Sequence, residues 1–181
     1  MNVRKIVFSA VVAALYVVLT LVSMPIAYGA VQFRISEVLC ILPFFFPFSV
    51  WGLVIGCIVA NLFSPYLMPD IIVGPIASLL AALSTMYIGK MKSRDTILTK
   101  VFACFPPVIF NAVIIGAMIA FLMVGDNSAD AFFPAFISST LWVGLGQLTI
   151  MYVLGLPLMI YLPKTNVINK LKALYIEGEN L

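Results

Sequence analysis

Long apolar runs fill most of this chain, and they constrain its fold more than any other feature. The runs cover residues 6–24, 38–63, 71–89, 101–124 and about 132–162. Charged residues make up only 9% of the sequence, against roughly 25% in an average globular protein. A soluble domain of 181 residues needs far more polar side chains to cover its surface. The sequence therefore predicts an all-α integral membrane protein, with residues 1–181 forming a single membrane domain.

The residue types that carry most enzyme chemistry are missing or poorly placed. The chain has no histidine, which excludes Ser–His–Asp and Cys–His catalysis and histidine-bound metal. Cys40, Cys57 and Cys104 lie inside apolar runs, and no two of them form a C-x-x-C motif. No G-x-x-x-x-G-K-[ST] motif occurs, so we find no P-loop for ATP. We therefore expect no enzyme, no metal site and no cofactor in this chain.

The run 38–63 has two interpretations, one long helix or two short helices hinged at residues 47–49. With two crossings the chain has six spans, and nine of its ten basic residues fall on the side of both termini. With one crossing the chain has five spans, and eight basic residues fall on the side opposite to the N-terminus. Because basic residues gather on the cytoplasmic side, we predict six transmembrane helices with both termini cytoplasmic. The nine residues are Arg4, Lys5, Lys90, Lys92, Arg94, Lys100, Lys164, Lys170 and Lys172, and Arg34 is the tenth.

The six predicted helices differ in length. They cover residues of about 4–24, 37–47, 49–63, 71–90, 101–124 and 132–162, and a cytoplasmic tail over 163–181 follows. The sixth contains Gly155 and Pro157, so we expect it to bend near its cytoplasmic end. The second and third, of about 11 and 14 residues, are too short to cross a hydrocarbon layer about 30 Å thick. They are either tilted or begin beneath an inserted loop, and the second arrangement implies an outward-facing ligand pocket.

Polar side chains gather near the predicted outer ends of the helices. A polar or charged group inside a membrane protein is costly, so it usually has a partner or a function. We expect the group to converge on one outward-facing pocket. Its candidate substrate-binding residues are Gln32, Phe33, Arg34 and Glu37 from the first loop, together with Asn61, Tyr66, Asp70, Asn111, Trp142 and Gln147.

Each of these residues also has a purely structural interpretation. Arg34 and Glu37 are three positions apart, so on a helix they would pair with each other. In an extended loop they would instead point to opposite faces. Asp70 is placed to cap the N-terminus of the fourth helix. The others suit hydrogen bonds between helices (Asn61, Asn111, Gln147) or the aromatic belt at the membrane surface (Tyr66, Trp142).

The chemistry of this set is recognition rather than catalysis. Glu37 or Asp70 offers an acceptor for a ring N–H, and Asn111 or Gln147 offers an amide for a carbonyl. The aromatic residues offer flat faces for stacking. Arg34 would orient Glu37 or meet a ring carbonyl, with the first loop acting as a lid. These properties favour a planar heterocycle as the ligand.

Four sequence strings resemble those of a known transporter family. The string Val31–Glu37 is similar to the signature of the QueT-type family, and it is the most specific of the four. The strings Asp70–Gly74, Pro107–Ala112 and Gly155–Leu158 also resemble family strings, in matching order. The resemblance covers about residues 4–162. It identifies the chain as a member of the S components of energy-coupling factor (ECF) transporters.

The resemblance implies a substrate-binding subunit of an ATP-driven importer in the bacterial cytoplasmic membrane. Its substrate would be a queuosine precursor, a 7-deazaguanine such as queuine or its aminomethyl precursor. Its partners would be a transmembrane coupling subunit, contacted by Ala10 and Ala14, and two cytoplasmic ATPases that bind the ATP. The family commonly has an acid where this chain has Gln147. A neutral residue there weakens the preference for a cationic aminomethyl group and admits queuine or another deazaguanine.

Two other functions compete with this interpretation. A stand-alone secondary transporter would need deep acids for proton relay, and Glu37 and Asp70 are expected near the outer edge. An S component for another vitamin-like heterocycle would share the same fold. The Ala10–Ala14 pair also has an alternative role, because small residues at four-residue spacing often serve packing within a bundle. An intramembrane enzyme is disfavoured by the lack of histidine and of paired deep carboxylates.

Overall fold

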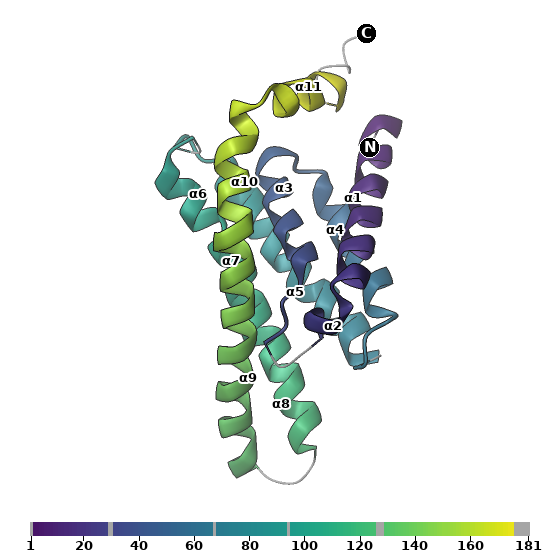
Figure 1. Cartoon of the computed structure of the whole chain (residues 1–181), viewed down its shortest axis with the longest axis vertical. Helices are drawn as coiled ribbons and strands as arrows, with labels where there is room; N and C mark the ends of the chain where they lie inside the picture. The colour runs from purple at the N-terminus through teal and green to yellow at the C-terminus, as the bar shows by residue number, and fades with distance from the viewer. Residues whose placement is uncertain (1, 29–30, 67, 94, 126–128, 176–181) are drawn as a thin grey trace.

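The computed structural model describes residues 2–28, 31–66, 68–93, 95–125 and 129–175 (Figure 1). Within these ranges every regular element is a helix, as the sequence predicts. Four helical stretches are long and apolar enough to cross a membrane, namely Val3–Val22, Met68–Gly89, Ile97–Val124 and Asp130–Lys164. Two shorter apolar helices cover Ile35–Phe45 and Ser49–Asn61. Length and composition thus support a multi-pass membrane protein, and the six-span topology stays a prediction.

The first helix, α1 (Val3–Val22), packs closely against α4 (Ser49–Asn61) through small residues. A Cβ added at Gly52 would collide with the backbone oxygen of Ser9, and one added at Gly56 would collide with Ala13 and Tyr16. Glycine at these two positions therefore lets the two backbones approach each other, which is how helices associate in lipid.

The two short helices form a hairpin with a break at residues 46–48. The first consists of a 3-10 segment, η1 (Ile35–Ile41), and one α-helical turn, α3 (Leu42–Phe45), which has Pro43 in its first turn. A 3-10 helix rises about 2.0 Å per residue, which is more than an α-helix does. The segment η1 therefore spans a greater distance than an α-helix with the same number of residues. The rings of Phe46 and Phe48 lie 5.1 and 5.2 Å from that of Phe8, which fixes the hairpin turn against the start of α1.

Proline affects the fourth and fifth predicted helices differently: the fourth stays continuous and the fifth is interrupted. Helix α5 (Met68–Gly89) runs through Pro75. The stretch Ile97–Val124 divides into α6 (Ile97–Ala103), α7 (Phe105–Phe110), a π-helical turn η2 (Asn111–Ile115) and α8 (Gly116–Val124). The break after α6 comes just before Pro106 and Pro107, whose missing N–H groups prevent a continuous hydrogen-bond ladder.

The last apolar stretch contains a second π-helical turn. It divides into α9 (Ala129–Thr149), η3 (Ile150–Gly155), α10 (Leu156–Tyr161) and the short η4 (Leu162–Lys164). The irregularity lies at the predicted Gly155–Pro157 position, where proline removes one donor. The predicted tail 163–181 contains a further helix, α11 (Asn166–Tyr175), which crosses one end of the bundle (Figure 1), and residues 176–181 lie outside the described residues.

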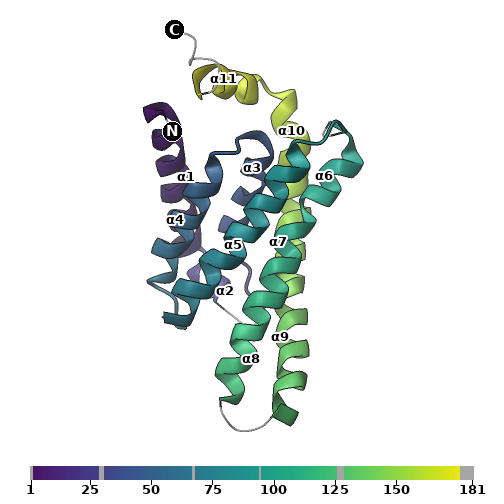
Figure 2. The ribbon, with the colours of Figure 1, turned by 180° about the vertical axis from the view of Figure 1, so that it is seen from behind.

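The start of α1 and the end of α11 lie at the same end of the molecule (Figures 1 and 2). Arg4 Nη1 donates to the backbone oxygen of Leu174 at 3.3 Å, and the rings of Phe8 and Tyr175 are 5.1 Å apart. The turn between α5 and α6, which carries Lys90 and Lys92, lies toward this end as well. Several segments that carry these basic residues therefore lie toward one end of the molecule; Arg94 lies outside the described residues.

Cysteine labelling will test the sidedness of this end. We expect a membrane-impermeant maleimide to label a cysteine introduced at Asp130 in intact cells, and to label one at Ser93 only after lysis. Both positions are exposed, whereas the native Cys40, Cys57 and Cys104 are buried. The sequence also offers Asn127 as an outer labelling position, and it lies outside the described residues. Labelling of Ser93 from outside would reverse the predicted topology.

Candidate functional site

A layer of buried polar side chains separates two hydrophobic clusters in the bundle. Cluster one includes Cys40, Cys57, Ala82, Val108 and Met151, and cluster two includes Ala77, Ile115 and Val143. On three helices a polar residue lies between members of the two clusters: Ser78 on α5, Asn111 on η2 and Gln147 on α9. With Arg34, Glu37, Asn61 and Asp70, these residues form what we call the polar layer, and each is at most 2% exposed.

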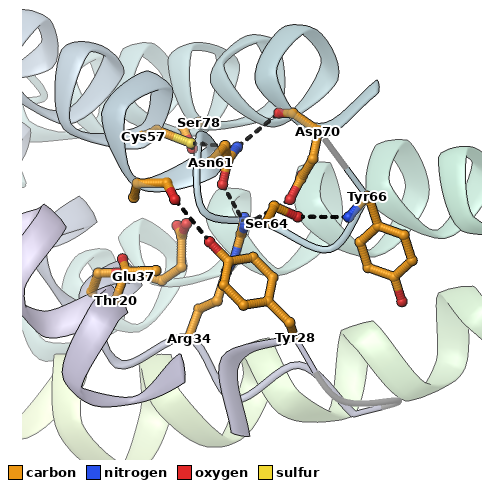
Figure 3. A network of polar contacts seen from close by, with 12 residues as sticks. Thr20, Tyr28, Arg34, Glu37, Cys57, Asn61, Ser64, Tyr66, Asp70 and Ser78 are labelled. Atoms are coloured by element: carbon orange, nitrogen blue, oxygen red, sulfur yellow. Dashed lines mark hydrogen bonds and ion pairs between the residues drawn. The ribbon is translucent and has the colours of Figure 1, made fainter. Parts of the chain in front are cut away.

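Arg34 makes a buried ion pair with Asp70. Its Nη2 lies 3.0 Å from Asp70 Oδ2 and donates to Asn61 Oδ1 at 2.6 Å (Figure 3). Asn61 Nδ2 in turn donates to the backbone oxygen of Asp70 at 2.7 Å. The guanidinium carbon lies 5.0 Å from the ring centroid of Tyr28, whose hydroxyl donates to the backbone oxygen of Ala60. One arginine thereby joins the first loop to α4 and to the first turn of α5.

Glu37 has a separate set of partners, all of them neutral. Tyr16 donates to its Oε1 at 2.5 Å, and Cys40 and Asn111 donate to its Oε2 at 3.2 and 3.3 Å. The side chain is fully buried. The expected alternative of an Arg34–Glu37 pair is therefore wrong. Arg34 has extended backbone angles immediately before the 3-10 segment, so the two side chains do not share a helical face.

The loop 31–34 is closed against α9. Gln32 has a positive φ of 47°, and a Cβ added at Gly146 would collide with the backbone oxygens of Val31 and Gln32. Phe33 N donates to the backbone oxygen of Ile26 at 2.9 Å, which ties the loop back to α2 (Met24–Ala27). Gln32 is buried and Phe33 is half-buried. The absence of a side chain at Gly146 is thus what lets this loop cover the helix.

Tyr66 and Trp142 lie away from the polar layer, beside a cavity of about 250 Å³. Ser138 and Ser139 of α9 and Met123 of α8 also line this cavity. The Tyr66 ring points away from Arg34 (Figure 3), and Trp142 is 49% exposed. The structure therefore divides the predicted site residues into three groups: the polar layer, the loop residues Gln32 and Phe33, and the two cavity aromatics.

Sequence reasoning missed several members of the polar network. Tyr16 and Thr20 lie one turn apart on the buried face of α1, where Thr20 donates to Ser36 at 2.7 Å. Cys40 donates to Glu37, and Cys57 accepts from Ser78 at 3.4 Å. The hydroxyl groups at four-residue spacing on α1 were the available signal, because such positions share one helical face. The two cysteines lie inside apolar runs, where cysteine usually behaves as a small apolar residue, so the sequence gives no signal of this role.

Two atoms of the polar layer have no hydrogen-bond partner among the described residues. They are Arg34 Nε, which can only donate, and Gln147 Oε1, which can only accept. Both belong to side chains that are at most 2% exposed. An unmet buried donor or acceptor costs about 1–3 kcal/mol, so such groups call for a partner that the described residues do not supply.

Comparison with known proteins reveals the family. A sequence profile of the QueT transporter family matches residues 6–164. This chain belongs to the QueT transporter family. A curated relative, the "Queuosine precursor transporter QueT" of Lactococcus lactis subsp. cremoris (strain MG1363), is 42% identical to this chain over 76 residues. That match covers 41% of this chain and 44% of the relative, and no solved structure matches the chain.

Membership confirms three predictions from the sequence. The resemblance of the string Val31–Glu37 and its companions to the QueT family is confirmed by the profile match. The family is one of transporters, so this QueT-family chain is not an enzyme. Its apolar helices, together with the family, identify it as a multi-pass protein of the bacterial plasma membrane.

Removing one member of the buried ion pair will destabilise the bundle. We expect Asp70→Asn to lower the free energy of unfolding by about 3–5 kcal/mol, because it leaves the Arg34 charge buried without its partner. The double variant Arg34→Gln, Asp70→Asn should lose less than the sum of the two single variants. Thermal unfolding in detergent measures both effects, with the exposed Asp130→Asn as control. Additive losses would show that the pair is not coupled.

Proposed function

We propose that this chain is the substrate-binding subunit of an ATP-driven ECF-type importer for a queuosine precursor. The family match and the name of the Lactococcus relative support the substrate class. The substrate is a 7-deazaguanine, such as queuine or its aminomethyl precursor. The energy comes from partner subunits, a transmembrane coupling protein and two cytoplasmic ATPases.

The two unpartnered atoms of the polar layer are the observation that carries this proposal. A 7-deazaguanine presents a carbonyl acceptor and several N–H donors along one edge. Arg34 Nε offers a donor to the carbonyl, and Gln147 Oε1 offers an acceptor to a ring or amino N–H. Such a ligand would supply the hydrogen bonds that these buried atoms lack. Asn111 adds a second amide to the same layer.

The first loop and the outer cavity fit a path for the ligand. The loop 31–34 would open as a lid, since it is held to α9 by close packing at Gly146 and to α5 by the Arg34–Asp70 pair. Tyr66 and Trp142 line the cavity of about 250 Å³ and offer aromatic faces to an entering base. In this arrangement Tyr66 and Trp142 contact the ligand first, and the polar layer then forms hydrogen bonds with the polar edge of its ring.

The exposed face of α1 fits the docking of a coupling subunit. Small residues on this helix form two pairs: Ser9 and Ala13 face the glycines of α4, whereas Ala10 and Ala14 are exposed. Packing within the bundle therefore involves Ser9 and Ala13, and it leaves Ala10 and Ala14 accessible to another helix. A pair of alanines at four-residue spacing allows close approach of another membrane helix.

A stand-alone secondary transporter remains the second candidate, because one observation favours it. Glu37 is fully buried and has no ion-pair partner among the described residues, whereas an acid at the outer edge was expected. Buried acids of this kind can relay protons. Copurification distinguishes the two functions: the ECF proposal expects the tagged chain to bring down a coupling protein and ATPases, and the alternative expects transport by the chain alone in liposomes.

Calorimetric titration of the purified chain with queuine tests the binding function. We expect specific binding, and we expect Gln147→Leu to weaken it about tenfold, because the acceptor for a ligand N–H is lost. The control is Leu148→Ala, which changes the exposed neighbour on the same helix. Equal affinities of the three proteins would exclude Gln147 from the site, and the absence of any binding would contradict the proposed substrate.

Blocking the exposed alanine pair tests the coupling function. We expect Ala10→Trp, Ala14→Trp to abolish uptake by the assembled transporter while queuine binding to the isolated chain stays unchanged. The bulky rings would prevent close approach of the partner helix. The matched control is Ile72→Trp, Ile76→Trp, which places two rings at the same spacing on the exposed side of α5. Normal uptake by the alanine variant would show that the pair does not contact a partner.

A further inference from the structure

The polar layer carries one negative charge that no described residue balances. Its charged side chains are Arg34, Asp70 and Glu37. Arg34 and Asp70 form an ion pair at 3.0 Å, so their charges offset each other. Among the described residues, Glu37 accepts hydrogen bonds from Tyr16, Cys40 and Asn111, which are neutral. Ionised, Glu37 would give the layer a net charge of −1 in the interior of an apolar bundle.

The hydrogen bonds around Glu37 suit the ionised form and leave one of its acceptor positions without a donor among the described residues. An ionised carboxylate only accepts, and its two oxygens offer about four lone-pair sites. Two donors are directed at Oε2 and one at Oε1, so the open position is on Oε1. A buried charge without a counter-charge is strongly destabilising. The open position therefore suits a positively charged N–H donor.

No cation among the described residues fills this position. Arg34 is the basic residue of the layer, and it is held elsewhere by Asp70, Asn61 and the Tyr28 ring. The partnerless atoms Arg34 Nε and Gln147 Oε1 lie in the same layer as Glu37. A base bound by these two atoms would thus bring its substituent into the layer that contains the unbalanced carboxylate.

We infer that Glu37 is the counter-ion of a positively charged group on the ligand. The inference rests on the proposed function and narrows its substrate class to planar bases that bear a protonated amine. The neutral Gln147 does not remove the preference for a cation, since the negative charge is located on Glu37. An amine-bearing 7-deazaguanine therefore binds more tightly than a neutral one of the same shape.

Two bases that differ in charge provide the test. The purified chain is titrated calorimetrically at neutral pH with 7-aminomethyl-7-deazaguanine, whose amine is protonated, and with 7-cyano-7-deazaguanine, which is neutral. We expect the wild-type chain to bind the aminomethyl base at least about tenfold more tightly, the effect of pairing a buried charge. Glu37→Gln should remove this preference by weakening the aminomethyl base alone. Asp130→Asn, an exposed acid on α9, is the control and should leave both affinities unchanged.

The outcomes separate this inference from the proposed function. Equal wild-type affinities for the two bases would overturn the inference and leave the proposed function standing. A Glu37→Gln variant that binds both bases equally weakly would overturn it too, since Glu37 would then act only in packing. Binding of neither base by the wild-type chain would contradict the proposed function and the inference together. The wild-type comparison needs no variant, so it decides the matter even if Glu37→Gln does not fold.

Discussion

The buried pair of Arg34 and Asp70 is the interaction on which the rest of the site depends. Two charges inside an apolar bundle are tolerated only when they neutralise each other and their remaining donors are met. Asn61 and the Tyr28 ring meet part of this requirement for Arg34, and its Nε is left without a partner among the described residues. Because Arg34 immediately precedes the 3-10 segment, the pair also sets where η1 begins. The position of Glu37, three residues later, follows from that start.

The short helices and the small residues bring this polar layer into the bundle. A helical hairpin over residues 35–61 that turns at 46–48 presents its polar ends, Glu37 and Asn61, inside the protein rather than at its rim. Close packing makes the hairpin possible, since Gly52 and Gly56 let α4 lie against α1. Gly146 then lets the first loop close over α9. Small side chains thus provide the space in which the large polar ones meet.

The sequence predicted which polar residues lie inside the bundle better than it predicted their pairing. Lipid penalises any isolated polar group, so Arg34, Glu37, Asn61, Asp70, Asn111 and Gln147 were identifiable one by one, and all are buried. Pairing depends on the distance between side chains in the folded protein, which spacing along the chain does not reveal. Arg34 pairs with Asp70, 36 positions away, and not with Glu37. The sequence did not identify Tyr16 and Cys40 as members of the polar network, because both residue types are also common in apolar cores. Only their hydrogen bonds to Glu37 give them a polar role.

The division between satisfied and open groups explains how such a layer can be selective. Most of its polar atoms are fixed by hydrogen bonds inside the chain, so the few open ones are held in position before a ligand arrives. Preorganised groups bind more strongly because little freedom is lost on binding. Opening the loop, however, would separate Arg34 from Asp70 and expose two charges that the closed state pairs. In the proposed transport cycle every opening of the loop therefore costs free energy, and an ATP-driven partner suits that demand.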